Sequence, residues 1–119
     1  MILAVSGLGS ALRAEDLTIS FATCTGRFSA AMEHGWLMGA ASDRLEAERA
    51  AMIHLLEAVT PAGLAPEAGH ALLHRRIEAK FAHARLLQRG TFSTDPAEAR
   101  RALRLAEIHL SSCRSLLLG

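Results

Sequence analysis

The segment from Leu17 to Met38 constrains the fold most, because small or apolar residues recur in it at alternating steps of four and three. The members of this stripe are Leu17, Phe21, Cys24, Phe28, Ala31, Gly35 and Met38. A period near about 3.5 residues places them on one face of an α-helix. Gly26 and Gly35 each lower the intrinsic stability of that helix by about 1 kcal/mol relative to Ala. The segment therefore predicts a helix that neighbouring elements must hold in place.

The composition favours helices packed on helices. Of the 119 residues, 50% are hydrophobic but only 4% are aromatic, and most of the apolar content is Ala and Leu. The β-branched residues that strands use are few and scattered. A chain of this length forms one domain with its own core. We predict an all-α fold, a four-helix up-and-down bundle with antiparallel neighbours and short loops. The alternatives are a three-helix core with a loosely attached second helix, or an intertwined dimer.

Local start and stop signals divide the chain into an arm and four helices. Gly7 and Gly9 loosen residues 1–13, which we expect to be an N-terminal arm whose apolar side chains dock on the bundle or on a partner. Pro61 ends the second helix, because the residue before proline avoids helical dihedral angles. Asp95 is placed to cap the last helix. The single domain, residues 14–119, then contains helices over about 14–38, 42–60, 67–89 and 96–118.

The same periodicity assigns an inner face to each of the other helices. The predicted inner residues are Leu45, Met52, Leu55, Leu56 and Val59; Leu73, Ile77, Phe81, Ala84 and Leu87; and Ala99, Leu103, Ala106, Leu110, Cys113 and Leu117. Lys80 lies close to the stripe of the third helix at about 100° per residue. Glu48 lies at a similar place on the second helix. We therefore hypothesise a partly buried Glu48–Lys80 ion pair that fixes the helix register.

Charge and hydropathy argue against several classes of partner. The net charge is +1, which provides no general attraction to nucleic acid or to an anionic membrane. Residues 1–60 carry a charge of −3 and residues 61–119 a charge of +4, which suits a chain folded back on itself or two antiparallel copies. No uncharged apolar run of about 18 residues occurs. We expect no nucleic-acid partner and no membrane, and an arginine-rich face that is simply solvated.

The two cysteines, Cys24 and Cys113, both fall on predicted inner stripes. An antiparallel pairing of the first and last helices brings them within about one helical turn. They are either a redox pair or two small buried side chains, and the second interpretation is favoured because free Cys is among the most buried residue types. The N-terminal residues lack the basic start of a signal peptide. We therefore expect a cytoplasmic protein with reduced thiols.

The spacing of three histidines allows a metal site but does not establish one. His70 and His74 form an H-x-x-x-H pair, and His109 lies on the last helix at about the height of His74. Surface histidines are the favoured interpretation, so no metal ion and no other cofactor is expected. No glycine-rich phosphate loop, nucleophile elbow or H-E-x-x-H motif is present, and no catalytic residue is assigned. The sequence leans against an enzyme, although a site at a dimer interface stays open.

A second strip on the first helix points to self-association. It lies opposite the inner stripe and consists of Ile19, Ala22, Gly26, Ala30 and Leu37. A helix with two faces of low polarity must be covered twice, by its own chain or by another copy. We expect an isologous homodimer that binds other, unidentified proteins as an adaptor or small chaperone. The alternative is a bundle that binds a metal or small ligand through His74, His109 and His70.

Overall fold

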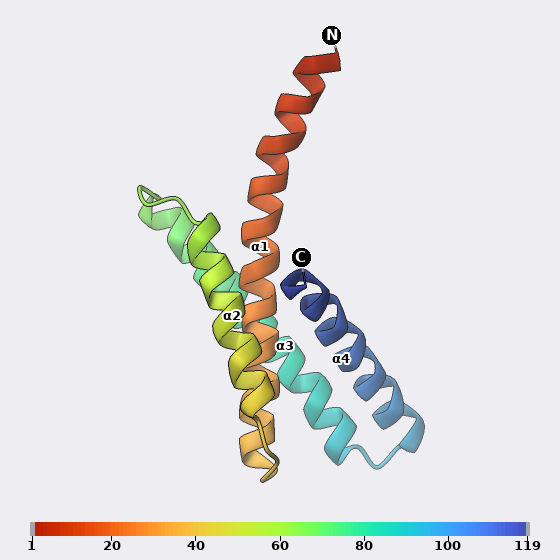
Figure 1. Cartoon of the computed structure of the whole chain (residues 1–119). Helices are drawn as coiled ribbons and strands as arrows, with labels where there is room; N and C mark the ends of the chain where they lie inside the picture. The colour runs from red at the N-terminus through yellow and green to blue at the C-terminus, as the bar shows by residue number, and fades with distance from the viewer. Residues whose placement is uncertain (1, 119) are drawn as a thin grey trace.

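Four α-helices make up the computed structural model, which describes the backbone of residues 2–118 and the side chains of residues 16–118. The helices are α1 (Ile2–Leu37), α2 (Asp43–Val59), α3 (Pro66–Phe92) and α4 (Pro96–Leu117). They run alternately in opposite directions, with α1 in the centre, α3 crossing it on one side, and α2 and α4 flanking it (Figure 1). The described residues contain no strand. The predicted all-α bundle is confirmed.

The length of α1 differs most from the sequence prediction. It begins at Ile2, so residues 2–13 continue the helix where we expected an arm. No proline interrupts this stretch, and once a helix has started each further residue adds one backbone hydrogen bond. How the side chains of residues 1–13 pack lies outside the described residues. None of the described helices carries an apolar stretch long enough to cross a bilayer.

The main core forms on the stripe predicted for α1. Its buried members are Phe21, Cys24, Phe28 and Ala31 of α1, Met52 of α2, and Leu110 and Cys113 of α4. Partly buried side chains complete it, namely Leu45, Leu55, Leu56, Val59, Leu87, Leu116 and Leu117. The inner face predicted for α2 is therefore confirmed, as is most of that for α4. The two ends of the α1 stripe, Leu17 and Met38, are exposed because the other helices do not reach them.

The opposite face of α1 is covered by α3, at a crossing where Gly26 lets the two backbones approach. A Cβ atom at Gly26 would meet the carbonyl oxygen of Arg76 and would lie 2.9 Å from the backbone nitrogen of Lys80. Only glycine fits so close to another main chain. Ala22 and Ala30, one turn to either side, are buried as well. The strip that the sequence left open to a second copy is therefore covered within one chain.

The predicted inner face of α3 is wrong by a rotation of about one residue, or about 100°, over Leu73–Phe81, whereas Leu87 packs against the core as predicted. Leu73, Ile77 and Phe81 are 52%, 42% and 57% exposed, although we expected them inside. The side that meets α1 instead carries Ala79, and His83 on the same side of α3 is fully buried. Backbones as close as those at Gly26 require small side chains between them, and Ala79 satisfies this where the bulky ring of Phe81 would not.

At the α3–α4 turn, a close approach and a cap set how α4 begins. Gly90 lies against the side chain of Leu103, and a Cβ atom there would overlap it. The Oδ1 atom of Asp95 accepts a hydrogen bond from the backbone nitrogen of Ala97 at 3.0 Å, which confirms the predicted cap. α3 runs past Gly90 to Phe92, three residues beyond the predicted end at 89.

Gly26→Ala is expected to destabilise the protein by about 1–3 kcal/mol, because the added methyl group forces α3 away from α1. Gly69→Ala in α3 is the matched control, since the nearest atom to its Cβ position is 4.0 Å away. There the gain in helix propensity should stabilise the fold by up to about 1 kcal/mol. Urea unfolding followed by circular dichroism measures both. Equal stabilisation by the two variants would contradict the close crossing.

Candidate functional site

Three of the five residues predicted for self-association lie inside the chain. Ala22, Gly26 and Ala30 are buried along the α1–α3 crossing, whereas Ile19 and Leu37 are exposed. These five residues do not form one open surface, so a second copy is not needed to cover Gly26. The homodimer itself stays a prediction, but a surface for it has to be sought elsewhere.

The three histidines considered for a metal do not come together. His70 and His74 are exposed on α3, and the Nε2 atom of His74 lies 2.8 Å from a carboxylate oxygen of Glu78 in the same helix. His109 of α4 instead lies near His83, with 6.4 Å between the ring centroids. Among the described residues, no three His, Cys, Asp or Glu side chains are grouped so that they could hold a metal ion.

His83 is the polar residue that the sequence prediction missed. It is 1% exposed, and neither ring nitrogen has a hydrogen-bond partner among the described residues. Burial lowers the pKa of His83 from 6.5 to about 4, with smaller contributions from His109, Arg27 and His34. The ring is therefore neutral at pH 7. Only the correct rotation of α3 about its own axis would have indicated that His83 is buried. The apolar periodicity of the sequence indicated a different rotation.

A disulfide joins Cys24 of α1 to Cys113 of α4, with 5.5 Å between their Cα atoms. The sequence placed these residues close together but favoured reduced thiols, and that second expectation is wrong. A groove of about 290 Å³ lies between the two helices beside the disulfide. It is lined by Ile19, Ser20, Thr23, Cys24, Arg27, Ser112 and Leu116.

Basic nitrogens that pair with no described acidic side chain gather at this groove and next to it. The Nη1 atom of Arg27 lies 3.9 Å from the Sγ atom of Cys113. Burial lowers the pKa of Arg27, and burial together with the Arg27 charge lowers the pKa of His109. Within the described part of the chain, Arg27 forms no ion pair. Arg27, His83 and His109 together form what we term the basic cluster, where α1, α3 and α4 meet.

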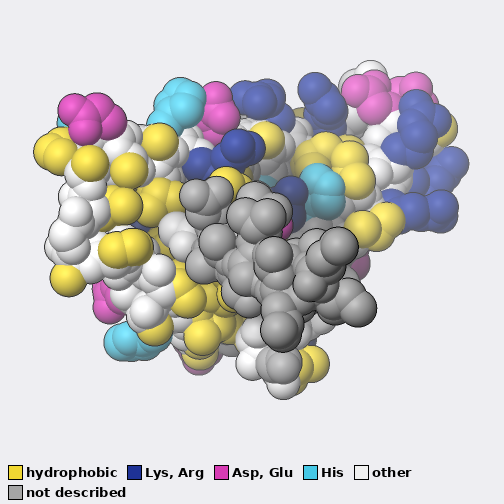
Figure 2. All heavy atoms as spheres, turned by 90° about the horizontal axis from the view of Figure 1, so that it is seen from above, with side chains coloured by type: hydrophobic (Ala, Val, Ile, Leu, Met, Phe, Trp, Pro, Cys, Tyr) yellow, Lys and Arg dark blue, Asp and Glu magenta, His cyan; other side chains and the backbone are white. Residues whose placement is uncertain are grey.

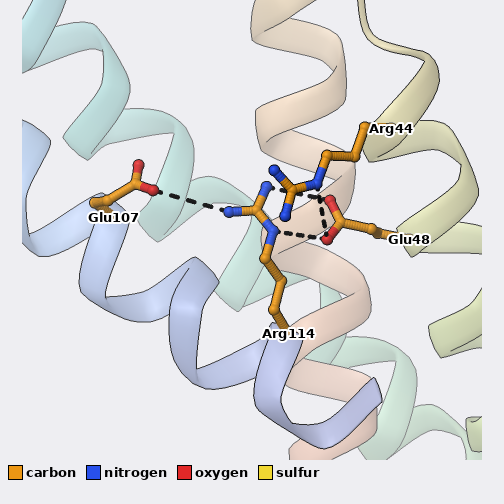
Figure 3. A network of polar contacts seen from close by, with 4 residues as sticks. All are labelled: Arg44, Glu48, Glu107 and Arg114. Atoms are coloured by element: carbon orange, nitrogen blue, oxygen red, sulfur yellow. Dashed lines mark hydrogen bonds and ion pairs between the residues drawn. The ribbon is translucent and has the colours of Figure 1, made fainter. Parts of the chain in front are cut away.

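The polar network in Figure 3 links α2 to α4. Glu48 accepts hydrogen bonds from the Nε and Nη2 atoms of Arg114 at 2.6 and 3.1 Å, so both carboxylate oxygens are used. Arg44 lies 3.7 Å from the same carboxylate, and Glu107 lies 3.8 Å from Arg114. The hydrogen bond to Glu48 is the main reason that the pKa of Arg114 is raised. The network holds together two helices that otherwise touch little.

The hypothesised Glu48–Lys80 ion pair does not form. Lys80 instead lies 2.8 Å from the carboxylate of Glu33 on α1. The prediction failed because it assumed that α3 is an antiparallel neighbour of α2 at this height, whereas α3 makes its main contact with α1. The charge of Lys80 fixes the α1–α3 crossing close to Gly26.

Three exposed apolar residues of α3, Leu73, Ile77 and Phe81, form what we term the α3 stripe. They are spaced at i, i+4 and i+8 and extend over about 12 Å of the helix. A second, larger groove of about 450 Å³ lies near the start of α3. It is mostly apolar and is lined by Thr18, Ile19, Val59, Pro61, Leu64, Ala68, Ala71, Leu72 and Arg75.

Basic side chains collect at the end of the molecule away from this larger groove. Figure 2 shows Lys and Arg gathered on the side where α4 and the end of α3 lie. Arg100, Arg101 and Arg104 of α4 are all exposed. Acidic side chains lie beside the basic ones in the same view. That this arginine-rich face is only solvated stays a prediction.

The pKa of His83 predicts a pH dependence of stability. The folded-state pKa is depressed, so the unfolded chain binds the proton more tightly. The neutral ring contributes its full stability above pH 6.5, and that stability is lost as the pH falls toward about 4. The loss should reach about 1.4 kcal/mol per pH unit.

Urea unfolding at several pH values should give a shallower pH slope for His83→Leu than for the natural protein. His54→Leu, at an exposed histidine of α2, should keep the natural slope, and equal slopes for all three proteins would contradict the prediction.

The Glu48–Arg114 contact should show a measurable coupling energy. A double-mutant cycle with Glu48→Gln and Arg114→Gln is expected to give about 1–2 kcal/mol, above the range of exposed ion pairs because the contact is partly buried and uses both carboxylate oxygens. Thermal unfolding of the four proteins measures it. Lys80→Gln with Glu48→Gln is the control cycle and should give no coupling.

Comparisons with protein-family models, with curated proteins and with solved structures found no match to this chain. Its function is therefore argued from its own geometry. Two features stand out from the packed core, namely the α3 stripe on the outside and the groove that borders the disulfide and the basic cluster.

Proposed function

We propose that this protein is a non-enzymatic, self-associating helical bundle that binds other proteins through the α3 stripe. The observation that carries the proposal is the exposure of Leu73, Ile77 and Phe81, three large apolar side chains on one helix face. A contiguous apolar face on a soluble domain is typical of a protein-binding surface. The function resembles that of an adaptor or small chaperone.

The spacing of the α3 stripe suits the face of another helix. Helix recognition generally depends on apolar anchors three, four or seven residues apart, and the α3 stripe offers two successive steps of four. In a two-fold symmetric pair of stripes, Ile77 lies near the axis and Leu73 of one copy approaches Phe81 of the other. The proposed homodimer contact is therefore on α3 and not on the Gly26 strip of α1.

The alternative functions have weaker support. A metal-binding bundle required His70, His74 and His109 to converge, and these residues lie apart on α3 and α4. The larger groove near the start of α3 has room for a small apolar ligand, but Arg75 is the only charged residue that lines it in the described part of the chain. Pockets that select small ligands usually combine an apolar wall with several convergent polar groups.

A cytoplasmic location stays a prediction, and the disulfide adds a condition on the redox state of the two cysteines. Disulfides persist mainly in oxidising compartments and are rare in the cytosol. If the protein is cytoplasmic, Cys24 and Cys113 must be reduced for part of the time. Alkylation of the two thiols in intact cells, before lysis, determines which state dominates.

Ile77→Asp is expected to weaken self-association by at least about tenfold, because a charge must then be buried in the contact. Sedimentation velocity over a concentration series measures it, with circular dichroism as the check on folding. Leu105→Asp is the matched control, since Leu105 is an exposed apolar residue on α4, outside the α3 stripe. A natural protein that stays monomeric at every concentration, or equal effects of both variants, would contradict the proposed contact.

Binding to other proteins is tested by a photoreactive residue placed at Phe81 in the native host. The same residue at Leu105 is the control. Proteins cross-linked at position 81 and absent at position 105 would support the α3 stripe as the binding surface. Identical cross-linking at both positions would argue against it.

A further inference from the structure

Only one of the two cysteines of the buried Cys24–Cys113 disulfide borders a groove. Cys24 lines the groove between α1 and α4, and Cys113 does not. The exposed fractions agree with this, at 4% for Cys24 and 0% for Cys113. A small molecule in the groove therefore approaches the disulfide from the side of Cys24.

A positive charge also lies next to one sulfur atom of the disulfide, that of Cys113. The guanidinium group of Arg27 lies 3.9 Å from the Sγ atom of Cys113. A nearby cation favours the thiolate form of a cysteine. No carboxylate in the described part of the chain pairs with Arg27, so its charge is available to a thiolate at Cys113. His83 and His109 supply further ring nitrogens close by.

The lining of the groove favours the binding of an anionic small molecule. Among the described residues, Arg27 is the only charged one that lines it, and the polar lining residues Ser20, Thr23 and Ser112 carry hydroxyl groups. Hydroxyl groups and a guanidinium group can donate hydrogen bonds to a carboxylate. A thiol that carries carboxylates should therefore enter more readily than one that carries an amine.

We propose that Cys24–Cys113 is an exchangeable disulfide, in which a small anionic thiol attacks Cys24 from the groove and Cys113 leaves as a thiolate beside Arg27. This activity does not depend on protein binding through the α3 stripe. Reduction would remove a covalent link between α1 and α4, two helices that make few other contacts.

The exchange balances in two steps. In the first, the thiolate of the small molecule forms a bond to Cys24 Sγ, the Cys24–Cys113 bond breaks, and its electron pair stays on Cys113. In the second, another thiolate attacks the sulfur of the bound small molecule and releases Cys24 as a thiolate. Two thiols are oxidised to one small disulfide and the protein gains two electrons. The protons lost by the two small thiols pass to solvent, which reprotonates the released cysteines according to their pKa values.

Arg27 is a positioning residue in this proposal, and its effect should follow its charge. Arg27→Gln should slow the first step by about threefold to tenfold, because the leaving thiolate loses its neighbouring cation. Arg27→Lys should restore much of the rate. Arg104→Gln, at an exposed arginine of α4 away from the groove, is the matched control and should react at the natural rate.

The test treats the folded, oxidised protein with glutathione, which carries a net negative charge, or with cysteamine, which carries a positive one. Acid quenching, alkylation with iodoacetamide and peptide mass spectrometry then identify the modified sulfur. We expect glutathione on Cys24 with alkylated Cys113, and a glutathione-to-cysteamine rate ratio higher in the folded protein than in urea.

Three results would overturn the proposal. They are reaction only after unfolding, glutathione attached to Cys113, and an unchanged rate in Arg27→Gln. Circular dichroism of each variant before the reaction shows that the fold is intact. If Arg27→Gln does not fold, the rate ratio of the two thiols and the site of attachment in the natural protein decide the question by themselves.

Discussion

The close approach of α1 and α3 at Gly26 determines most of this structure. α1 is apolar or small on two opposite faces, and a helix of that kind is unstable unless both faces are covered. One face receives α2 and α4 through Phe21, Phe28 and the residues around them. The other receives the backbone of α3, which only the absence of a side chain at Gly26 permits. The glycine that weakens α1 as an isolated helix is thus the residue that lets α1 occupy the centre of the bundle.

Several properties of α3 follow from that contact. A helix that lies with its backbone against α1 must present small residues there, so Ala79 meets α1, and Leu73, Ile77 and Phe81 are turned outward. The same rotation buries His83, whose two ring nitrogens then have no partner among the described residues. An exposed apolar surface and a buried polar side chain on one helix therefore have a common cause.

α4 is held by a different kind of interaction. It packs mainly on α3, and its links to α1 and α2 are few. One of them is the disulfide to Cys24, and another is the hydrogen-bonded ion pair between Arg114 and Glu48. In the chain-entropy view, a disulfide between residues 89 apart stabilises the fold by up to about 4–5 kcal/mol by restricting the unfolded chain. The position of α4 thus depends on its packing against α3 and on a few specific contacts to α1 and α2.

The sequence by itself determined the helical class, the inner stripe of α1, the inner face of α2 and the cap of α4, because these depend on local periodicity and on turn chemistry. It also placed Cys24 and Cys113 near each other. It did not determine which side of α3 is buried, since α3 has an apolar stripe that satisfies the periodicity rule and yet lies outside. Only the tertiary structure decided that, because the fit of Ala79 against Gly26 outweighs the burial of Leu73, Ile77 and Phe81. The partners of Lys80 and Glu48 were decided in the same way, by which helices came close enough for their side chains to meet.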